Sequence, residues 1–281
     1  MSTLDTLVPR DLGWRMFLLT IVGRAYPRVV GQMRERTWIF FETFLPFLAT
    51  AGYVYVYRAI QAPEDYIGFV VIGGAMTAFW LNVMWLMASQ LYWEKENGNL
   101  ALFIMSPTSL MAILLGMAIG GMLATCLRAV VIITLGTLLF NVHFAVSSFA
   151  QLLAVFLLTM AALYGLGMLL SSLFLLWGRE AWQISMLMQE PIYFVSGFYF
   201  PVKSFPLVVA MVSSLVPLTL GMDAMRQLVF ESGPLLKFLP VSVEIGVLII
   251  LAVVFVVAAK FWLDFMIRKA VAEGTLTDRR R

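Results

Sequence analysis

Long uncharged stretches alternate with short charged segments along the chain, and they divide it into candidate membrane-spanning helices. No Asp, Glu, Lys or Arg occurs from Tyr66 to Trp93 or from Ala129 to Gly178. A helix that crosses the hydrocarbon core of a bilayer needs about 20 predominantly apolar residues. The pattern therefore predicts an all-α polytopic membrane protein with six transmembrane helices. The predicted spans are residues 37–57, 66–91, 109–139, 149–176, 182–202 and 238–260.

Segment 204–222 is also uncharged, but it contains Pro206 and Pro217, and we interpret it as a re-entrant helical hairpin before the last span. Twelve of the 19 Lys and Arg residues lie in 1–36 and 260–281. Because basic segments stay on the cytoplasmic side, both termini are expected in the cytoplasm. A seventh full span would move one of them across the membrane. Backbone can dip into the membrane without crossing it where it is buried in protein.

The N-terminal segment, residues 1–36, is predicted to contain an amphipathic helix that lies on the cytoplasmic membrane surface. Apolar residues recur there at helical spacing, with arginines between them. Such a helix places its apolar face among the headgroups and its basic residues near anionic lipids. The remainder divides into a transmembrane domain, 37–262, and a basic cytoplasmic tail, 263–281. The apolar residues are Trp14, Phe17, Leu18, Ile21, Val22 and Ala25.

Composition excludes several classes of protein. Hydrophobic residues make up 62% of the chain and charged residues 12%, against about 25% charged residues in soluble domains. A water-soluble enzyme and a nucleic-acid-binding domain are therefore excluded. The single cysteine, Cys126, and the single histidine, His143, leave no cysteine metal site and no His-based triad. Phosphate-loop, His-Glu-x-x-His and Gly-x-Ser-x-Gly motifs are absent from the sequence. We predict that the chain is not an enzyme and binds no cofactor or metal itself.

Four ionisable residues fall inside predicted spans. Placing a charged group in the membrane costs free energy, so these residues are candidates for a functional role. Glu42 is expected about 9 Å below the membrane surface, snorkelling or paired with an arginine. Arg128 lies well into the third span and is expected towards the outer side, either paired with a carboxylate or used for substrate. Glu190 directly precedes Pro191, which disrupts helix hydrogen bonding, so gating and structural roles are both open. Glu244 is expected close enough to the outer surface to be hydrated.

Segment 92–108, between the second and third spans, is the most informative cytoplasmic stretch. A charged cluster is followed by a glycine and then by apolar residues that a solvated loop would not need. We interpret it as an amphipathic element that docks on a partner, with an ordinary polar loop as the alternative. The residues assigned to this contact are Glu94, Lys95, Glu96, Gly98, Leu100 and Phe103.

Three segments resemble the ABC-2-type permeases, the membrane subunits of ATP-binding-cassette exporters. The loop from Glu94 through Ser106-Pro107 resembles the family's acidic-Gly-Leu…Ser-Pro loop. The segment 196–201, followed by Phe205-Pro206, resembles its Ser-Gly…Phe-Pro turn after the fifth span. The segment 217–226 resembles the Pro-Leu-Thr…Ala-x-Arg stretch before the last span.

The resemblance implies a permease that exports a hydrophobic or amphipathic substrate, such as a drug, lipid or glycoconjugate, across the plasma (bacterial inner) membrane. ATP and Mg²⁺ would bind a separate cytoplasmic ATPase subunit. A second permease chain, identical or related, would complete the transporter, and membrane lipids would surround it. Segment 92–108 would then contain the coupling helix. Candidates for the transport path or its gating are Glu190, Pro191, Arg128, Phe198, Phe200 and Pro201.

Two other classes of function are alternatives. An ion-coupled secondary transporter would use Glu190, Arg128 and Glu42 and would work without an ATPase, but segment 92–108 would then have no role. An intramembrane enzyme would need a nucleophile or metal set, and the sequence has no recognisable one.

Overall fold

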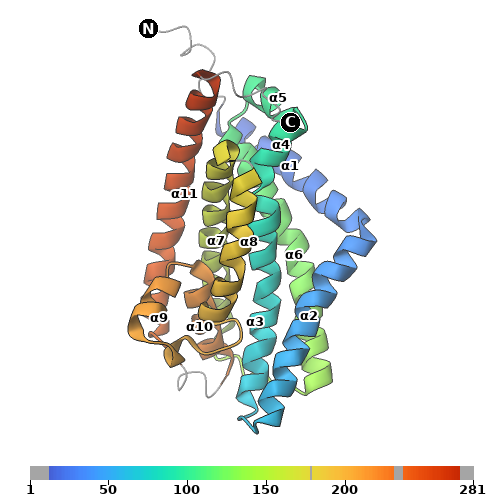
Figure 1. The fold of residues 1–281 in the computed structure, drawn as a ribbon, viewed down its shortest axis with the longest axis vertical. Coiled ribbons are helices and arrows are strands. Elements are labelled where there is room, and N and C mark those ends of the chain that lie inside the picture. The colour runs from blue at the N-terminus through green and yellow to red at the C-terminus, as the bar shows by residue number, and fades with distance from the viewer. Residues whose placement is uncertain (1–12, 178, 231–236, 273–281) are drawn as a thin grey trace.

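The computed structural model describes the backbone of residues 13–177, 179–230 and 237–272, and every regular element in these ranges is helical (Figure 1). The longer helices form a bundle, with short helices at its two ends. In chain order the elements are α1 (Trp14–Arg34), α2 (Arg36–Ala59), α3 (Asp65–Leu81), the π-helical η2 (Asn82–Met87), α4 (Gln90–Glu96), α5 (Asn99–Met105), α6 (Leu110–Phe140), α7 (Phe149–Trp177), α8 (Arg179–Val195), the 3₁₀ turn η3 (Val202–Ser204), α9 (Leu207–Ser213), α10 (Pro217–Val229) and α11 (Val241–Ala272).

Five helices among the described residues are long and apolar enough to cross a membrane, which confirms the prediction of an all-α polytopic membrane protein. The predicted fifth span, 182–202, corresponds to α8, which ends earlier, at Val195. It ends there because Gly197 adopts a left-handed backbone with φ of 82°, which a helix cannot continue through. The five segments are Arg36–Ala59, Asp65–Glu96, Leu110–Phe140, Phe149–Leu175 and Val241–Lys269.

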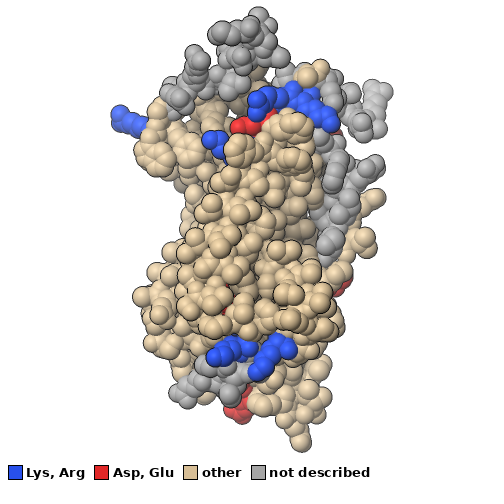
Figure 2. Space-filling view, turned by 90° about the vertical axis from the view of Figure 1, so that its left-hand side faces the viewer, with Lys and Arg blue, Asp and Glu red and all other residues tan. Residues whose placement is uncertain are grey.

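Charged side chains lie towards the two ends of the molecule. Figure 2 shows Lys and Arg side chains near both ends of one face, separated by a broad belt of mostly uncharged residues. This distribution is the one expected of a bundle whose middle lies in hydrocarbon, because charges there are expensive.

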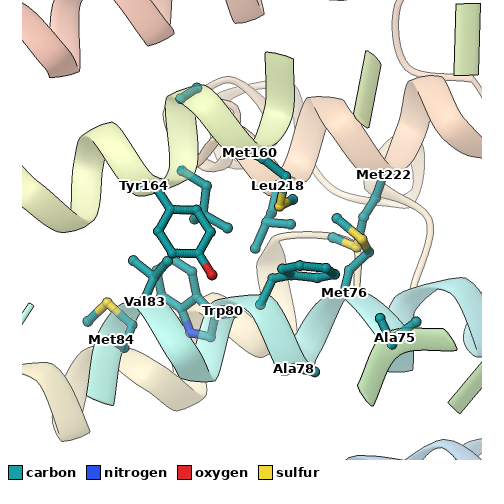
Figure 3. Close-up of a cluster of buried hydrophobic side chains, with 14 of the residues drawn as sticks. Ala75, Met76, Ala78, Trp80, Val83, Met84, Met160, Tyr164, Leu218 and Met222 are labelled. Carbon is teal, nitrogen blue, oxygen red and sulfur yellow. The ribbon is translucent and has the colours of Figure 1, made fainter. Parts of the chain in front are cut away.

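Helix α3 lies at the centre of the bundle, and every residue from Ile67 to Trp80 is buried. It packs against α2, α6 and α10, and the ring of Phe79 contacts that of Phe156 on α7. Because neighbouring helices cover it on all sides, its sequence can be apolar all round. Figure 3 shows part of this core, where side chains of α3, α7 and α10 converge. The core residues labelled there include Met76 and Trp80 of α3, Met160 and Tyr164 of α7, and Leu218 and Met222 of α10.

The π-helical segment η2 connects α3 to α4 without a break, so Asp65–Glu96 forms one continuous rod. Its wider winding is seen in the Ala88 N–H, which donates to the Val83 carbonyl five residues earlier at 2.8 Å. Asn82 begins this segment and is buried. Its side-chain oxygen accepts a hydrogen bond from the Tyr164 hydroxyl of α7 at 3.0 Å, so the rod is attached to α7 where the winding changes.

Helix α1 packs closely along α6 through a Gly-x-x-x-Gly pair. A Cβ atom at Gly116 would lie 2.6 Å from the Ile21 carbonyl oxygen, and one at Gly120 would lie 2.7 Å from that of Ala25. Only glycine allows the two backbones to approach so closely. The helix continues through Pro27 to its end at Arg34.

Helices α9 and α10 form a bent pair at the end of the bundle opposite α4 and α5 (Figure 1). Their axes turn by 103° across a short break, and α9 has only seven residues, so the pair folds back near one end. The hairpin predicted at 204–222 is present as this bent pair. It extends further, to Val229, because polar residues near its end are buried rather than exposed.

Candidate functional site

Helices α4 and α5 form the element that the sequence assigns to coupling. Gly98 joins them with φ of 78°, a conformation that other residues rarely adopt, which accounts for a glycine here. Glu94 connects the two helices, because its carboxylate accepts hydrogen bonds from Gln90 Nε2 at 2.8 Å and from Asn99 Nδ2 at 2.9 Å. One member of the predicted charged cluster therefore stabilises the element internally.

The prediction that Leu100 and Phe103 anchor a partner is wrong. These side chains are 0% and 7% exposed and pack within this chain. The guanidinium group of Arg24 on α1 lies 4.1 Å from the centre of the Phe103 ring. Leu102 and Met105 face outward instead, at 60% and 75% exposed. Sequence reasoning grouped the apolar residues of α5 together, but helical spacing places Leu102 and Met105 on one side.

The α4–α5 element is attached to the bundle at several points. The Leu91 N–H donates to Ser171 Oγ of α7 at 3.3 Å, and Arg28 of α1 donates to the Leu86 carbonyl of η2 at 3.4 Å. Through Arg24 and Phe103 the element also contacts α1, which in turn packs on α6. A displacement of α5 would thus be transmitted to several long helices.

Glu42 of α2 and Arg128 of α6 form an ion pair, and the Arg128 guanidinium also donates to Gln32 Oε1 of α1 at 3.1 Å. The pairing fits one of the two roles predicted for each residue. It contradicts the expected position of Arg128 towards the outer side, because Glu42 lies in the second turn of α2. The first turns of α6 pack beside α1, so Arg128 lies less deep than a count along the uncharged run suggests.

A small cavity adjoins this ion pair. Its volume is about 90 Å³, several-fold less than the roughly 300 Å³ or more of pockets that hold drug-sized ligands. It is lined by Gln32, Met33, Ile39, Thr43, Ala124, Leu127, Arg128 and Val131.

Glu190 and Pro191 lie on the outward side of α8, where both side chains are exposed. Apolar neighbours on the same helix, among them Met186, Leu187 and Phe194, are exposed as well. The structure does not bring Glu190 and Arg128 together, since Arg128 is occupied by Glu42 and Gln32. Among the α8 side chains that the structure describes, Glu190 is therefore an exposed carboxylate beside exposed apolar residues.

The predicted path residues Phe198, Phe200 and Pro201 form a packed turn after α8. Phe198 and Pro201 are buried. The ring of Phe198 contacts that of Tyr193 at 5.3 Å between centroids, and the ring of Phe200 contacts that of Tyr53 at 5.8 Å. In this conformation the described residues of the turn pack against neighbouring helices.

Arg226 of α10 holds this turn in place, and sequence reasoning did not single it out as a site residue. Its buried guanidinium group donates to the carbonyls of Gly197 at 2.6 Å, Phe198 at 3.1 Å and Phe69 of α3 at 2.9 Å. It also lies 3.2 Å from the centre of the Phe69 ring. The sequence did contain a sign of this role: an arginine within the otherwise apolar hairpin segment must find hydrogen-bond partners when it is buried.

Glu244 is not hydrated, contrary to expectation. It is 0% exposed and contacts the end of α10, where the side-chain amide of Gln227 donates to its carboxyl group at 3.2 Å. Its position seven residues after Lys237 suggested a surface location, but the bent pair covers it.

The family described as ABC-2 type transporter matches residues 18–230 of the chain. No curated protein matches the chain significantly. The matched residues run from α1 to the end of α10 and include the α4–α5 element, the packed turn and the bent pair. Because the match covers more than half of the chain, and the helical membrane architecture agrees with it, the chain belongs to the ABC-2 type transporter family.

Proposed function

We propose that the chain is the membrane-spanning subunit of an ATP-driven exporter, which works as two permease chains bound to separate cytoplasmic ATPase subunits. Family membership establishes the coarser function, a transporter permease. The observation that carries the rest is the α4–α5 element. Its inner side is fixed to α1 and α7, whereas Leu102 and Met105 present an apolar pair outward.

The geometry suggests how ATPase movement would reach the membrane. Glu94 connects α4 to α5, and the packed Leu100 and Phe103 join the element to the bundle. A push on its outer side would therefore move it as a unit with α1 and the α3–α4 rod. ATP and Mg²⁺ would bind the ATPase, since this sequence has no phosphate loop.

The exposed residues on the outward side of α8 are the argument for a second permease chain. A carboxylate that faces hydrocarbon is expensive, and Glu190 is exposed among apolar residues of this chain. We place this surface against the second chain, identical or related, with the transport path between them. A largely apolar lining that includes the Glu190 carboxylate suits a substrate that is itself hydrophobic or amphipathic, such as a drug, lipid or glycoconjugate.

The proposed orientation places both termini in the cytoplasm and the chain in the plasma (bacterial inner) membrane. The first turns of α1 and the last turns of α11 lie at the same end as α4 and α5 (Figure 1). Most Lys and Arg residues belong to the two terminal segments, and basic segments stay inside.

The decisive experiment changes the outward apolar pair of α5. The double variant Leu102→Ser, Met105→Ser should lose most ATPase co-purification and substrate-stimulated ATP hydrolysis, because desolvated apolar anchors carry much of the affinity of an interface. The matched control is Leu207→Ser, Val208→Ser, an equally exposed apolar pair on α9 at the opposite end. Normal ATPase binding by the α5 variant would overturn the proposed docking site.

A second experiment tests the role of α8. Glu190→Gln should lower ATP-dependent transport in proteoliposomes while ATPase co-purification stays normal. If transport instead ran on an ion gradient without ATP, the ion-coupled alternative would replace the exporter.

A further inference from the structure

Two buried carboxyl groups meet where the bent pair joins the last helix. Asp223 of α10 is 6% exposed and Glu244 of α11 is 0% exposed. Both accept a hydrogen bond from the same nitrogen, Gln227 Nε2, at 3.1 Å to Asp223 Oδ2 and 3.2 Å to Glu244 Oε2. Two oxygens that share one donor nitrogen are close neighbours.

The hydrogen bonds around this pair are unbalanced. Gln227 Nε2 also donates to the Leu239 carbonyl at 2.8 Å, so its two hydrogens face three acceptors. Asp223 Oδ2 accepts a second bond, from the Phe238 N–H at 2.9 Å. Glu244 Oε1 is buried and has no partner. The acceptors in this cluster outnumber the donors, and a proton on Glu244 would supply the missing donor.

The charges show the same deficit. The basic side chain of Arg226 interacts electrostatically with Asp223 but directs its donors to three carbonyls elsewhere. It can offset one negative charge, and a second carboxylate in the same dry site would be uncompensated. The other titratable groups on the described elements around the pair are Asp65 and Tyr66 of α3, His143, Tyr164 of α7 and the exposed Lys237, together with Lys260, Asp264, Arg268 and Lys269, which lie at least 16 residues beyond Glu244 along α11.

We propose that Asp223 and Glu244 form a proton-binding site that fastens the bent pair α9–α10 to α11. The proton resides on Glu244 and makes its unpaired oxygen a donor to the Asp223 carboxylate, which shares the Gln227 donor with Glu244. When the proton leaves to water, two carboxylates face each other in a buried site, and the junction of α10 with α11 is weakened. The site is argued from burial, hydrogen bonds and charge, and it does not depend on the proposed export function.

Infrared spectroscopy of the purified chain tests the proton directly. The wild type should show the carbonyl stretch of a protonated carboxylic acid at neutral pH, and Glu244→Gln should remove that band. Glu64→Gln, which changes an exposed carboxylate between α2 and α3, is the control and should leave it in place. Asp223→Asn keeps the band but should shift its frequency, and it serves if Glu244→Gln does not fold.

Thermal unfolding at a series of pH values gives a second readout. Because the native state holds a proton that the unfolded chain releases, stability should fall as pH rises through the titration of the site. The unfolding temperature of the wild type should therefore drop by a few degrees more than that of Glu244→Gln between neutral and alkaline pH. The proposal would be overturned if wild type and Glu244→Gln showed the same dependence of unfolding temperature on pH and the same infrared spectrum. It would also be overturned if sodium or calcium stabilised the wild type and Glu244→Gln abolished that effect, because the site would then bind a metal cation.

Discussion

Arg128 on α6 pairs with Glu42 on α2, and the same guanidinium group donates to Gln32 near the end of α1. One side chain thus joins the three helices that meet where the chain turns from α1 into α2. Both charged groups are largely buried, with the Arg128 side chain 4% and the Glu42 side chain 16% exposed. Such a pair is sensitive to the loss of one member, because the other is left buried without compensation.

Glu42→Gln should therefore destabilise the chain by about 3 kcal/mol, measured by denaturant unfolding in detergent. Adding Arg128→Gln should restore part of the loss, since the double variant leaves no unpaired charge. Glu35→Gln, at an exposed position in the same bend, is the control and should change stability by less than about 0.5 kcal/mol. Additive losses at Glu42 and Arg128 would argue against the pair.

Gly120→Ala should destabilise the protein, although alanine normally favours a helix by about 1 kcal/mol over glycine. The new methyl group would lie 2.7 Å from the Ala25 carbonyl and force α1 away from α6. Gly52→Ala on α2 meets no atom within 4 Å and should be neutral or stabilising. A lower unfolding temperature for Gly120→Ala but not for Gly52→Ala would confirm the close approach, and the same change in both variants would contradict it.

Arg226→Lys should weaken the packed turn while keeping its positive charge. A lysine cannot reach three carbonyls with a planar fork of donors, so we expect a loss of about 2 kcal/mol in stability and faster proteolysis at the turn. The control is Arg268→Lys, an exposed position on α11. Unchanged proteolysis in Arg226→Lys would show that positive charge alone holds the turn.

Labelling of single cysteines tests the orientation. In a Cys126→Ser background, an impermeant thiol reagent should modify Ser204→Cys, near the bent pair, in intact cells. It should modify Asn97→Cys, between α4 and α5, only after the membrane is opened. Both positions are exposed in the structure. The reverse pattern would place the α4–α5 element outside and exclude ATPase docking there.

Much of the fold could be predicted because charges interrupt the apolar runs so clearly. The uncharged stretch from Tyr66 to Trp93 became the buried rod of α3, η2 and α4, and Asn141 ends α6 near the predicted turn. Depth in the membrane could not be predicted in the same way. The beginning of α6 is apolar because α1 covers it, so counting from the start of the run placed Arg128 too deep.

The site was harder to predict because side-chain partners are distant in sequence. The ring of Phe103 packs against Arg24, which lies far earlier in the chain. Hydrophobicity alone does not tell whether such an apolar side chain binds a partner or packs inside its own chain. Glu244 is buried by contact with Asp223 and Gln227 on the preceding hairpin. The charged cluster and Gly98 do lie in one structural element, α4–α5, because their spacing is local, and docking of that element on a partner stays a prediction.

The π-helical segment η2 gives the α3–α4 rod a torsional degree of freedom. In a π-helical stretch each N–H bonds the carbonyl five residues earlier instead of four, so the stretch contains one residue more than an α-helix of the same length. Moving that surplus by one turn along the rod would rotate the intervening residues by about 100°, the angle per residue of an α-helix, without unfolding any of it. On the α3 side of η2 the rod is held by the core around Trp80, and on the other side it continues into Glu94 and α5. Such a rod can convert a push at its tip into a twist beneath it.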